Sequence, residues 1–194
     1  MEVINERLLY PSYEIIGGEK FMAAAANSIH NVLGGRLYMF IGTYLDAKDL
    51  GYCFTDSEDV HFPDGTLLKP DFSIVLKDRK DIIDWRGDIY GAPDMVVEVL
   101  SKSTWRRDLT IKKDTYEANG VREYWIIDPY MKLISVYLLR DGKFEFDDEY
   151  ILYDAAEFEK LTDAEKAAVK DEIPVKILDG LKIPLKRIFK WGYK

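Results

Sequence analysis

Residues 91–101 read GAPDMVVEVLS, and this stretch decides the fold. From Met95 to Leu100 the run is apolar except for Glu98, which is too continuous for a half-exposed strand and predicts a central strand covered on both faces. An ionised carboxylate is costly to bury there unless a cation, a metal ion or a shifted pKa compensates for the lost water. The chain must therefore supply a partner for Glu98.

Turn residues divide the segment before this strand into short elements. YEIIGG and EKFMAA, residues 13–24, are typical of two strands joined at Gly17 and Gly18. Apolar residues at helical spacing then predict a helix from Ser28 to Leu45. We expect the elements that follow to be a strand at 51–62, a second strand over LLKPDFSIVLK at 67–77, and a loop at 77–92.

The segment after the central strand has the same mixed character. Ser103 or Thr104 caps a predicted helix that runs to Asn119, and Gly120 supplies its left-handed end. The remaining expected elements are a strand at 123–128, an antiparallel hairpin formed by LISVYLL and KFEFDDEYILY, a polar surface helix at 163–172 and a closing tail at 175–191. This order of elements predicts an α/β fold, a sheet flanked by helices.

Length and composition predict one domain. With 194 residues and 47% hydrophobic content, the chain can bury a core of its own, which we place at about 13–139, followed by the hairpin, a short helix and a C-terminal strand at 140–194. The single cysteine, Cys53, excludes an internal disulfide, and no signal-peptide pattern is seen, so we expect a cytoplasmic location. No apolar run approaches the roughly 20 residues of a membrane span, so no membrane partner is expected.

The negative charge of the chain is concentrated in one segment. The formal net charge is −8, and residues 141–172 alone carry twelve Asp or Glu against four Lys, which is also −8. Elsewhere, residues 98–113 hold a small excess of basic side chains, namely Lys102, Arg106, Arg107, Lys112 and Lys113 against Glu98 and Asp108. These basic residues are either solvated charges on a helix face or contacts for a phosphate backbone.

Asp71 is the second acid that draws attention, because it lies just inside a predicted strand, after Pro70. Adjacent strands would put Asp71 beside Glu98. Two converging carboxylates repel each other, and either a shared proton or a divalent cation such as Mg²⁺ or Mn²⁺ relieves the repulsion. Taken alone, Asp71 is also explained as a turn acid at the start of a strand.

The helix at 103–119 offers a cation for this pair. At about 100° per residue, Trp105, Leu109 and Tyr116 define its inward face, and Lys112 lies closer to that face than Lys113 does. Lys112 would either neutralise Glu98 in a structural ion pair or orient a water and stabilise charge on a phosphate. Tyr116 itself is read as a core aromatic, and His30 and His61, which are isolated, as structural or surface residues.

The residues from 91 to 129 resemble a known family. GAPDMVVEVLS followed by TWRRDLTIKKDTYEANGVREYWIIDP is similar to the Uma-type family of putative restriction endonucleases, in the PD-(D/E)XK nuclease superfamily. The resemblance extends from about Tyr13 to Phe189 and includes YEIIGGEKFMAA, His30 and KPDFSIV. It implies a restriction-endonuclease-like core, a mixed sheet with a helix on each side, and metal-dependent cleavage of DNA.

The resemblance also implies roles for individual residues. Pro70 and Asp71 match the PD of the superfamily motif and Glu98 its second acid, so Asp71, Glu98 and the backbone carbonyl of Val99 would ligate Mg²⁺ or Mn²⁺. Leu100 stands where the superfamily has its lysine, a departure that points to Lys112 on the next helix. Glu19 matches a recurrent acid of the family and would complete the metal sphere.

Two other classes of function stay open at this point. The fold could be a non-catalytic nucleic-acid or protein-binding module, with Glu98 and Lys112 as a structural ion pair. A two-carboxylate glycoside hydrolase has the acids but lacks other signs of a sugar site. Phosphate contacts by Lys102, Arg106, Arg107 and Lys113 are expected only for a DNA partner.

The predicted loop at 77–92 contains apolar side chains, Ile82, Ile83, Trp85 and Ile89, that need cover. Nucleases that cut both strands often work as pairs, so a homodimer is the expected assembly.

Overall fold

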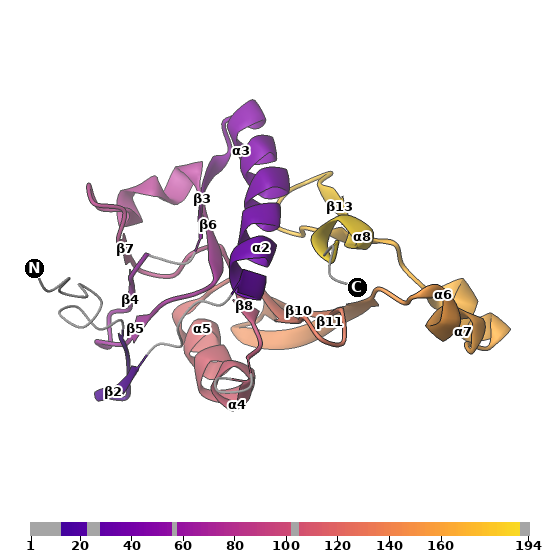
Figure 1. Ribbon diagram of the computed structural model, residues 1–194. Helices are drawn as coiled ribbons and strands as arrows, with labels where there is room; N and C mark the ends of the chain where they lie inside the picture. The colour runs from indigo at the N-terminus through magenta and orange to yellow at the C-terminus, as the bar shows by residue number, and fades with distance from the viewer. Residues whose placement is uncertain (1–12, 23–27, 56–57, 102–104, 191–194) are drawn as a thin grey trace, which may run out of the picture.

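Two sheets and two long helices form the body of the molecule in the computed structural model, which describes residues 13–22, 28–55, 58–101 and 105–190 (Figure 1). The larger sheet has the strand order β11-β10-β9-β8-β6-β3. Strand β8 (Met95–Val99) lies inside it, parallel to β9 (Glu123–Asp128) and antiparallel to β6 (Phe72–Leu76). All residues of β8 are buried, so the prediction of a central strand covered on both faces is confirmed.

Antiparallel strands complete the larger sheet on both sides. β3 (Gly51–Thr55) pairs with β6 at one edge. The predicted hairpin is confirmed as β10 (Leu133–Arg140) and β11 (Lys143–Ile151) at the other edge. Both residues of its turn have positive φ, 49° at Asp141 and 78° at Gly142, as a two-residue hairpin loop requires.

The smaller sheet has the order β2-β1-β5-β4-β7. The predicted pair at 13–24 is confirmed as β1 (Tyr13–Ile16) and β2 (Glu19–Met22), with Gly17 and Gly18 between them at φ 59° and 80°. The other strands are two-residue pieces: β4 (Val60–His61), β5 (Leu67–Leu68) and β7 (Ile89–Tyr90).

Two predicted strands are wrong as single elements. LLKPDFSIVLK divides into β5 in the smaller sheet and β6 in the larger one, because Pro70 between them lacks the N–H that a continuous ladder needs. Residues 51–62 likewise divide into β3 and β4, with 56–57 outside the described residues. The expected loop at 77–92 contains a 3₁₀ helix, η2 (Lys77–Ile82), before β7.

Each long helix contains a π-helical turn. The first consists of α2 (Ser28–Leu37), η1 (Tyr38–Gly42) and α3 (Thr43–Lys48). The second consists of α4 (Trp105–Arg107), η3 (Asp108–Lys112) and α5 (Lys113–Asn119), and Gly120 ends it at φ 87° as predicted. The expected caps Ser103 and Thr104 lie outside the described residues.

The π turn changes which residues of the second helix face inward. The inward face predicted from Trp105 and Leu109 is wrong, because these side chains are 43% and 38% exposed. The buried residues are Asp108, Lys112 and Tyr116. A π turn takes up one more residue than an α turn, so the residues before it are rotated relative to an unbroken helix.

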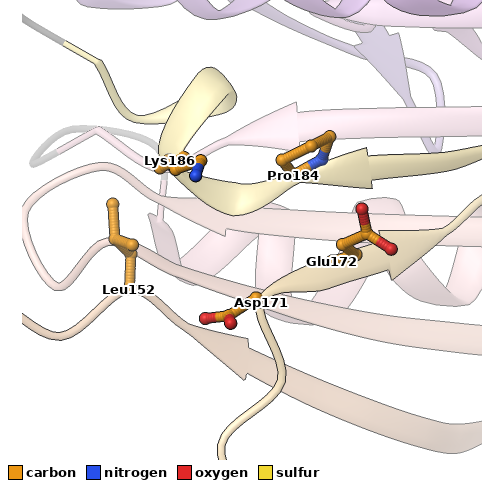
Figure 2. Close-up of a pocket in the computed structure, with 5 residues that line it drawn as sticks. All are labelled: Leu152, Asp171, Glu172, Pro184 and Lys186. Carbon is orange, nitrogen blue, oxygen red and sulfur yellow. The ribbon is translucent and has the colours of Figure 1, made fainter.

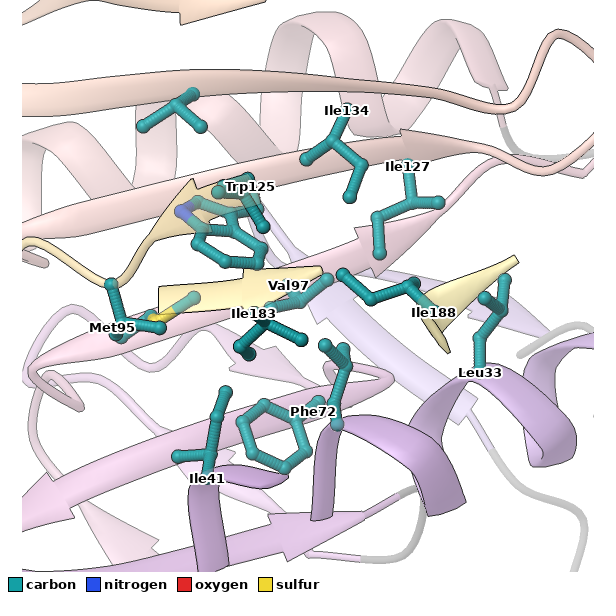
Figure 3. Close-up of a cluster of buried hydrophobic side chains, with 14 of the residues drawn as sticks. Leu33, Ile41, Phe72, Met95, Val97, Trp125, Ile127, Ile134, Ile183 and Ile188 are labelled. Carbon is teal, nitrogen blue, oxygen red and sulfur yellow. The ribbon is translucent and has the colours of Figure 1, made fainter. Parts of the chain in front are cut away.

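The larger sheet is covered on both faces. One core joins its Val97, Trp125 and Ile127 to Leu33 and Ile41 of the first helix and to the C-terminal segment (Figure 3). The other joins Val96, Tyr124 and Ile126 to Tyr116 and to the smaller sheet. Since side chains alternate along a strand, Glu98 belongs to the second face with Val96.

The C-terminal third returns to the body of the molecule. Helices α6 (Ala155–Glu159) and α7 (Asp163–Ala168) lie beyond the end of β11, away from the sheets (Figure 1). Strands β12 (Glu172–Pro174) and β13 (Lys182–Pro184) form a separate hairpin, and α8 (Leu185–Ile188) packs into the first core. Among the described residues, no helix is long and apolar enough to cross a membrane.

Candidate functional site

The predicted acids Asp71 and Glu98 lie at the same end of neighbouring strands. Phe72 of β6 pairs with Val97 of β8, so one step outward along the antiparallel register places Asp71 opposite Glu98. Asp71 Oδ2 accepts a hydrogen bond from the Val99 N–H at 2.6 Å, and its Oδ1 lies 2.8 Å from His30 Nδ1. Asp71 therefore links the end of the sheet to the first long helix.

Glu98 is the buried carboxylate at the centre of the site, with 2% of its surface exposed. Its Oε1 accepts hydrogen bonds from Lys112 Nζ at 3.0 Å and from the Tyr116 hydroxyl at 2.7 Å. Burial raises the pKa of Glu98 well above its ordinary value; Lys112 opposes the shift, and the nearby carboxylates add to it. Lys112 thus reaches Glu98 from the next helix, as the sequence predicted.

Lys112 is surrounded by carboxylates. Its Nζ lies 2.7 Å from Glu14 Oε1 and 3.6 Å from Asp108 Oδ1, in addition to Glu98, and the residue is 4% exposed. Burial alone would lower the pKa of Lys112, but the three carboxylates outweigh that effect and raise it above its ordinary value. Lys112 is therefore a buried cation that stays protonated.

Glu14 is the site residue that the sequence interpretation missed. It lies in β1 and is 3% exposed; besides Lys112, its Oε2 accepts a hydrogen bond from Arg107 Nη1 at 3.1 Å. Its signal was the same as that of Glu98, an acid on the buried side of a short strand, since Glu14 lies on the same face of β1 as the buried Ile16. Asp108 was also missed as a site residue, and Tyr116, correctly placed on the inward face, was interpreted as a core aromatic and not as a hydrogen-bond partner of Glu98.

The acid–lysine cluster, defined as Glu14, Asp71, Glu98, Asp108 and Lys112, holds more negative than positive charge. Arg107 adds a second cation through Glu14, so the four carboxylates, when ionised, exceed Lys112 and Arg107 by two among the described residues, with His30 beside Asp71 left out of the count. Close carboxylates without enough counter-charge bind protons or a metal ion. Burial is the main cause of the raised pKa of Glu98, and the nearby carboxylates add to it.

The donor set fits a hard cation. The described residues contain no preformed group of three or more His, Cys, Asp or Glu arranged to hold a metal. Mg²⁺, however, is usually held by one or two carboxylates, with water and substrate phosphate completing its octahedron. Asp71 and Glu98 supply two carboxylates, and the Val99 carbonyl faces the same side as its N–H, which bonds to Asp71. Glu19 is exposed in β2.

The residues predicted to contact phosphate differ in their surroundings. Arg107 donates to Glu14 and lies over the Phe21 ring at 4.9 Å, and its contact with phosphate stays a prediction. Arg106 is exposed and lies 5.2 Å from the Trp105 ring. Lys113 lies 3.9 Å from the Tyr137 ring. Lys102 lies outside the described residues.

Apolar residues of the 77–92 segment are mostly covered within the chain. Ile89 is fully buried, and Ile82 and Ile83 pack against the second core, so the expectation that all of them need an external cover is wrong. Trp85 is 90% exposed.

A cavity of about 620 Å³ lies apart from these acids, at the β12–β13 hairpin (Figure 2). It is lined by Leu152, Asp171, Glu172, Pro184 and Lys186. The predicted site residues are not among its lining, so the cluster and not this cavity is the candidate site.

The fold matches that of a nuclease-like protein. The crystal structure of a putative nuclease belonging to DUF820 from Anabaena variabilis is similar to this chain, with a TM-score of 0.70 at 20% sequence identity. The match covers 92% of this chain and 90% of the other. The predicted class, a restriction-endonuclease-like mixed sheet flanked by helices, is confirmed.

The sequence also gives the family. The family model described as Uma2, putative restriction endonuclease, matches residues 6–171. The chain belongs to this Uma2 family of putative restriction endonucleases, which confirms the resemblance read from the motifs and makes it a member of a nuclease family. No curated protein matches the sequence.

Proposed function

We propose that this chain is a metal-dependent endonuclease that uses Mg²⁺ or Mn²⁺ to hydrolyse phosphodiester bonds of DNA. The observation that carries the proposal is the position of Lys112, whose Nζ lies 3.0 Å from Glu98 although it comes from the following helix. The superfamily motif has a lysine two residues after its second acid, where this sequence has Leu100. Lys112 supplies a lysine beside Glu98 from another part of the chain. The surplus of carboxylates around it supports the binding of a cation.

Each residue of the cluster has a distinct part in this proposal. Asp71, Glu98 and the Val99 carbonyl would hold the metal ion, which supplies Lewis-acid polarisation of a phosphate and a bound water of lowered pKa. Lys112 stabilises the negative charge that develops on the phosphate oxygens. Tyr116 and Glu14 hold Glu98 and Lys112 through the contacts described above, and the place of Glu19, exposed in β2, in the metal sphere stays a prediction.

Cleavage of plasmid DNA tests the proposal directly. Purified protein with Mg²⁺ or Mn²⁺ should cut DNA, and Glu98→Gln and Asp71→Asn should each lose about 100-fold or more of this activity, as expected when a ligand or an electrostatic group is removed. Glu149→Gln is the matched control, the same change on an exposed acid of β11. Equal cleavage by Glu98→Gln and the unchanged protein would rule out catalysis at this site.

Metal binding can be measured without turnover. A ligand that binds only the folded state raises its stability, so millimolar Mg²⁺ should raise the melting temperature of the unchanged protein and of Glu149→Gln. Asp71→Asn should abolish that rise. A rise that survives in Asp71→Asn would place the metal elsewhere.

A non-catalytic module with the same fold is the second candidate. The observation in its favour is the pairing of Lys112 with both Glu98 and Glu14, which explains the buried lysine without chemistry. In that case the protein should bind DNA or a protein partner equally well in EDTA and show no cleavage with any divalent ion.

We also propose a homodimer in the cytoplasm as the working form. Trp85, at 90% exposure, supports an apolar contact between copies, and the single Cys53 suits a reducing compartment. Sedimentation of the unchanged protein and of Trp85→Ser tests the dimer; a monomer at all concentrations would contradict it.

A further inference from the structure

A small pocket lined in part by aromatic side chains lies just beyond the end of the strand that carries Glu98. Its volume is about 310 Å³, at the lower end of the range for sites that hold a small molecule. The residues that line it are Leu100, Ser101, Trp105, Leu109, Asp128 and Tyr130. It lies at the carboxyl ends of the parallel strands β8 and β9, the edge of an α/β sheet where ligands commonly bind.

The pocket and the cluster are built from the same elements. Leu100 and Ser101 directly follow β8, which carries Glu98, and Trp105 and Leu109 precede Lys112 in the second long helix. The Leu100 N–H donates to the Ile127 carbonyl at 2.8 Å, and the Trp105 N–H to the Ser101 carbonyl at 3.1 Å. Leu100 is two residues from Glu98 along the chain and Leu109 is three residues before Lys112, so a ligand in the pocket would lie at the same end of the sheet as the cluster.

Two exposed aromatic side chains line the pocket and are available for stacking. Trp105 and Tyr130 are 43% and 63% exposed, although aromatic side chains of this size are usually covered. Asp128 Oδ1 accepts hydrogen bonds from the N–H groups of Tyr130, at 2.9 Å, and Met131, at 3.0 Å, so the turn that presents Tyr130 is fixed. Arg106, 5.2 Å from the Trp105 ring, adds a positive charge at the same place.

We infer that this pocket is a stacking subsite for one unpaired nucleobase of the DNA substrate. The inference rests on the proposed function, which it extends to a substrate class. A base inside a duplex has both faces covered by its neighbours and cannot enter, whereas a base in a single strand or a splayed end can stack on Trp105 and Tyr130. The substrate is therefore DNA with an unpaired base next to the cut.

Binding without cleavage tests this subsite. The background is Glu98→Gln in EDTA, and the probes are a short fluorescein-labelled oligothymidylate, the same strand with abasic sites, and a blunt duplex. Trp105→Leu and Tyr130→Leu should each weaken binding of the oligothymidylate by about tenfold, the effect of losing one stacked base. Trp105→Phe keeps a ring and should restore most of the affinity. Tyr52→Leu is the matched control, an exposed tyrosine in β3.

The abasic strand separates stacking from charge. It should bind more weakly than the oligothymidylate, and Trp105→Leu should change its affinity little. The inference is overturned if Trp105→Leu and Tyr130→Leu bind oligothymidylate like the control, or if they lose affinity equally for the abasic strand. Because these measurements involve no catalysis, a base-dependent loss together with absent cleavage would refute the nuclease proposal and leave the subsite standing.

Discussion

The two ends of strand β8 each hold a buried acid, and their surroundings differ. Asp94, which directly precedes the strand, is 0% exposed; Arg79 and Arg122 donate to its Oδ1, each at 3.2 Å, and the Leu76 N–H donates to Oδ2 at 2.8 Å. One carboxylate there meets two guanidinium groups. At the Glu98 end the proportion is reversed in the part of the chain that the structure describes, where one lysine, Lys112, contacts three carboxylates.

A third buried acid supports this distinction. Glu123 of β9 accepts hydrogen bonds from the Trp125 indole and from the N–H groups of Lys176 and Ile177, and so fixes the C-terminal segment to the sheet. Burial raises its pKa, as at Glu98. Burial and a shifted pKa are thus common to structural and candidate functional acids, and the surplus of negative charge is what sets the Glu98 end apart.

Removing the cation from the Glu98 end should have the largest effect on stability. Lys112→Met leaves buried carboxylates without their partner and should lower the free energy of unfolding by about 3–5 kcal/mol. Adding Glu98→Leu to it should recover much of that loss. Urea denaturation of both variants measures this, and a loss below about 1 kcal/mol for Lys112→Met would show that the cluster is not held by its cation.

Neutralising the acid at the Asp94 end should come next. Asp94→Asn weakens the contacts of two arginines and a backbone N–H, and should cost about 1–3 kcal/mol. Once folded, the variant should keep the Mg²⁺-dependent rise in melting temperature, which Asp71→Asn should lose. A Mg²⁺ response that disappears in Asp94→Asn would erase the distinction between the two ends.

The pH dependence of stability should come from the Glu98 end. Between the ordinary pKa of 4.5 and its raised pKa, Glu98 keeps a proton in the folded state that the unfolded chain has released. The free energy of unfolding should therefore fall as pH rises through this window, by up to about 1.4 kcal/mol per pH unit. Glu98→Gln should remove that contribution. An unchanged slope in this variant would show that Glu98 titrates normally.

Neutralising Asp108 should have the smallest effect. Asp108→Asn loses a 3.6 Å contact with Lys112 but relieves repulsion with Glu98, so its free energy of unfolding should stay within about 1 kcal/mol of the unchanged protein. Thermal melting of Asp108→Asn and Asp94→Asn under the same conditions compares the two losses of stability. An equal loss of stability in the two variants would mean that the partners of Asp108 stabilise its carboxylate as much as those of Asp94 do.

Local patterns predicted the elements that carry their own signals. The apolar run around Glu98, the glycines of the β1–β2 turn and Gly120 after the second helix each act through neighbouring residues, and each prediction is confirmed. LLKPDFSIVLK was predicted as one strand although Pro70 interrupts it, and the tertiary pairing decides that its two halves belong to different sheets.

The residues of the candidate site could be predicted where they lie on elements that the sequence predicts correctly. Asp71, Glu98 and Lys112 were named from strand and helix positions, and the structure brings Lys112 to Glu98. Glu14 is far from them in sequence and is brought to Lys112 by the smaller sheet, so its partner could not be read locally. His30 was interpreted as isolated, but its Nδ1 lies 2.8 Å from Asp71 Oδ1. This contact also joins residues far apart in the sequence and could not be read locally.

The π turn at Asp108–Lys112 has a consequence for comparing members of this family. It holds one residue more than an α-helical turn would, so a relative with an unbroken helix here aligns correctly only when a one-residue gap is opened inside the turn. Without that gap, every position on one side of the turn is matched to a neighbour that points about 100° away. A lysine sought strictly by column would then be missed, although it occupies the same point in space.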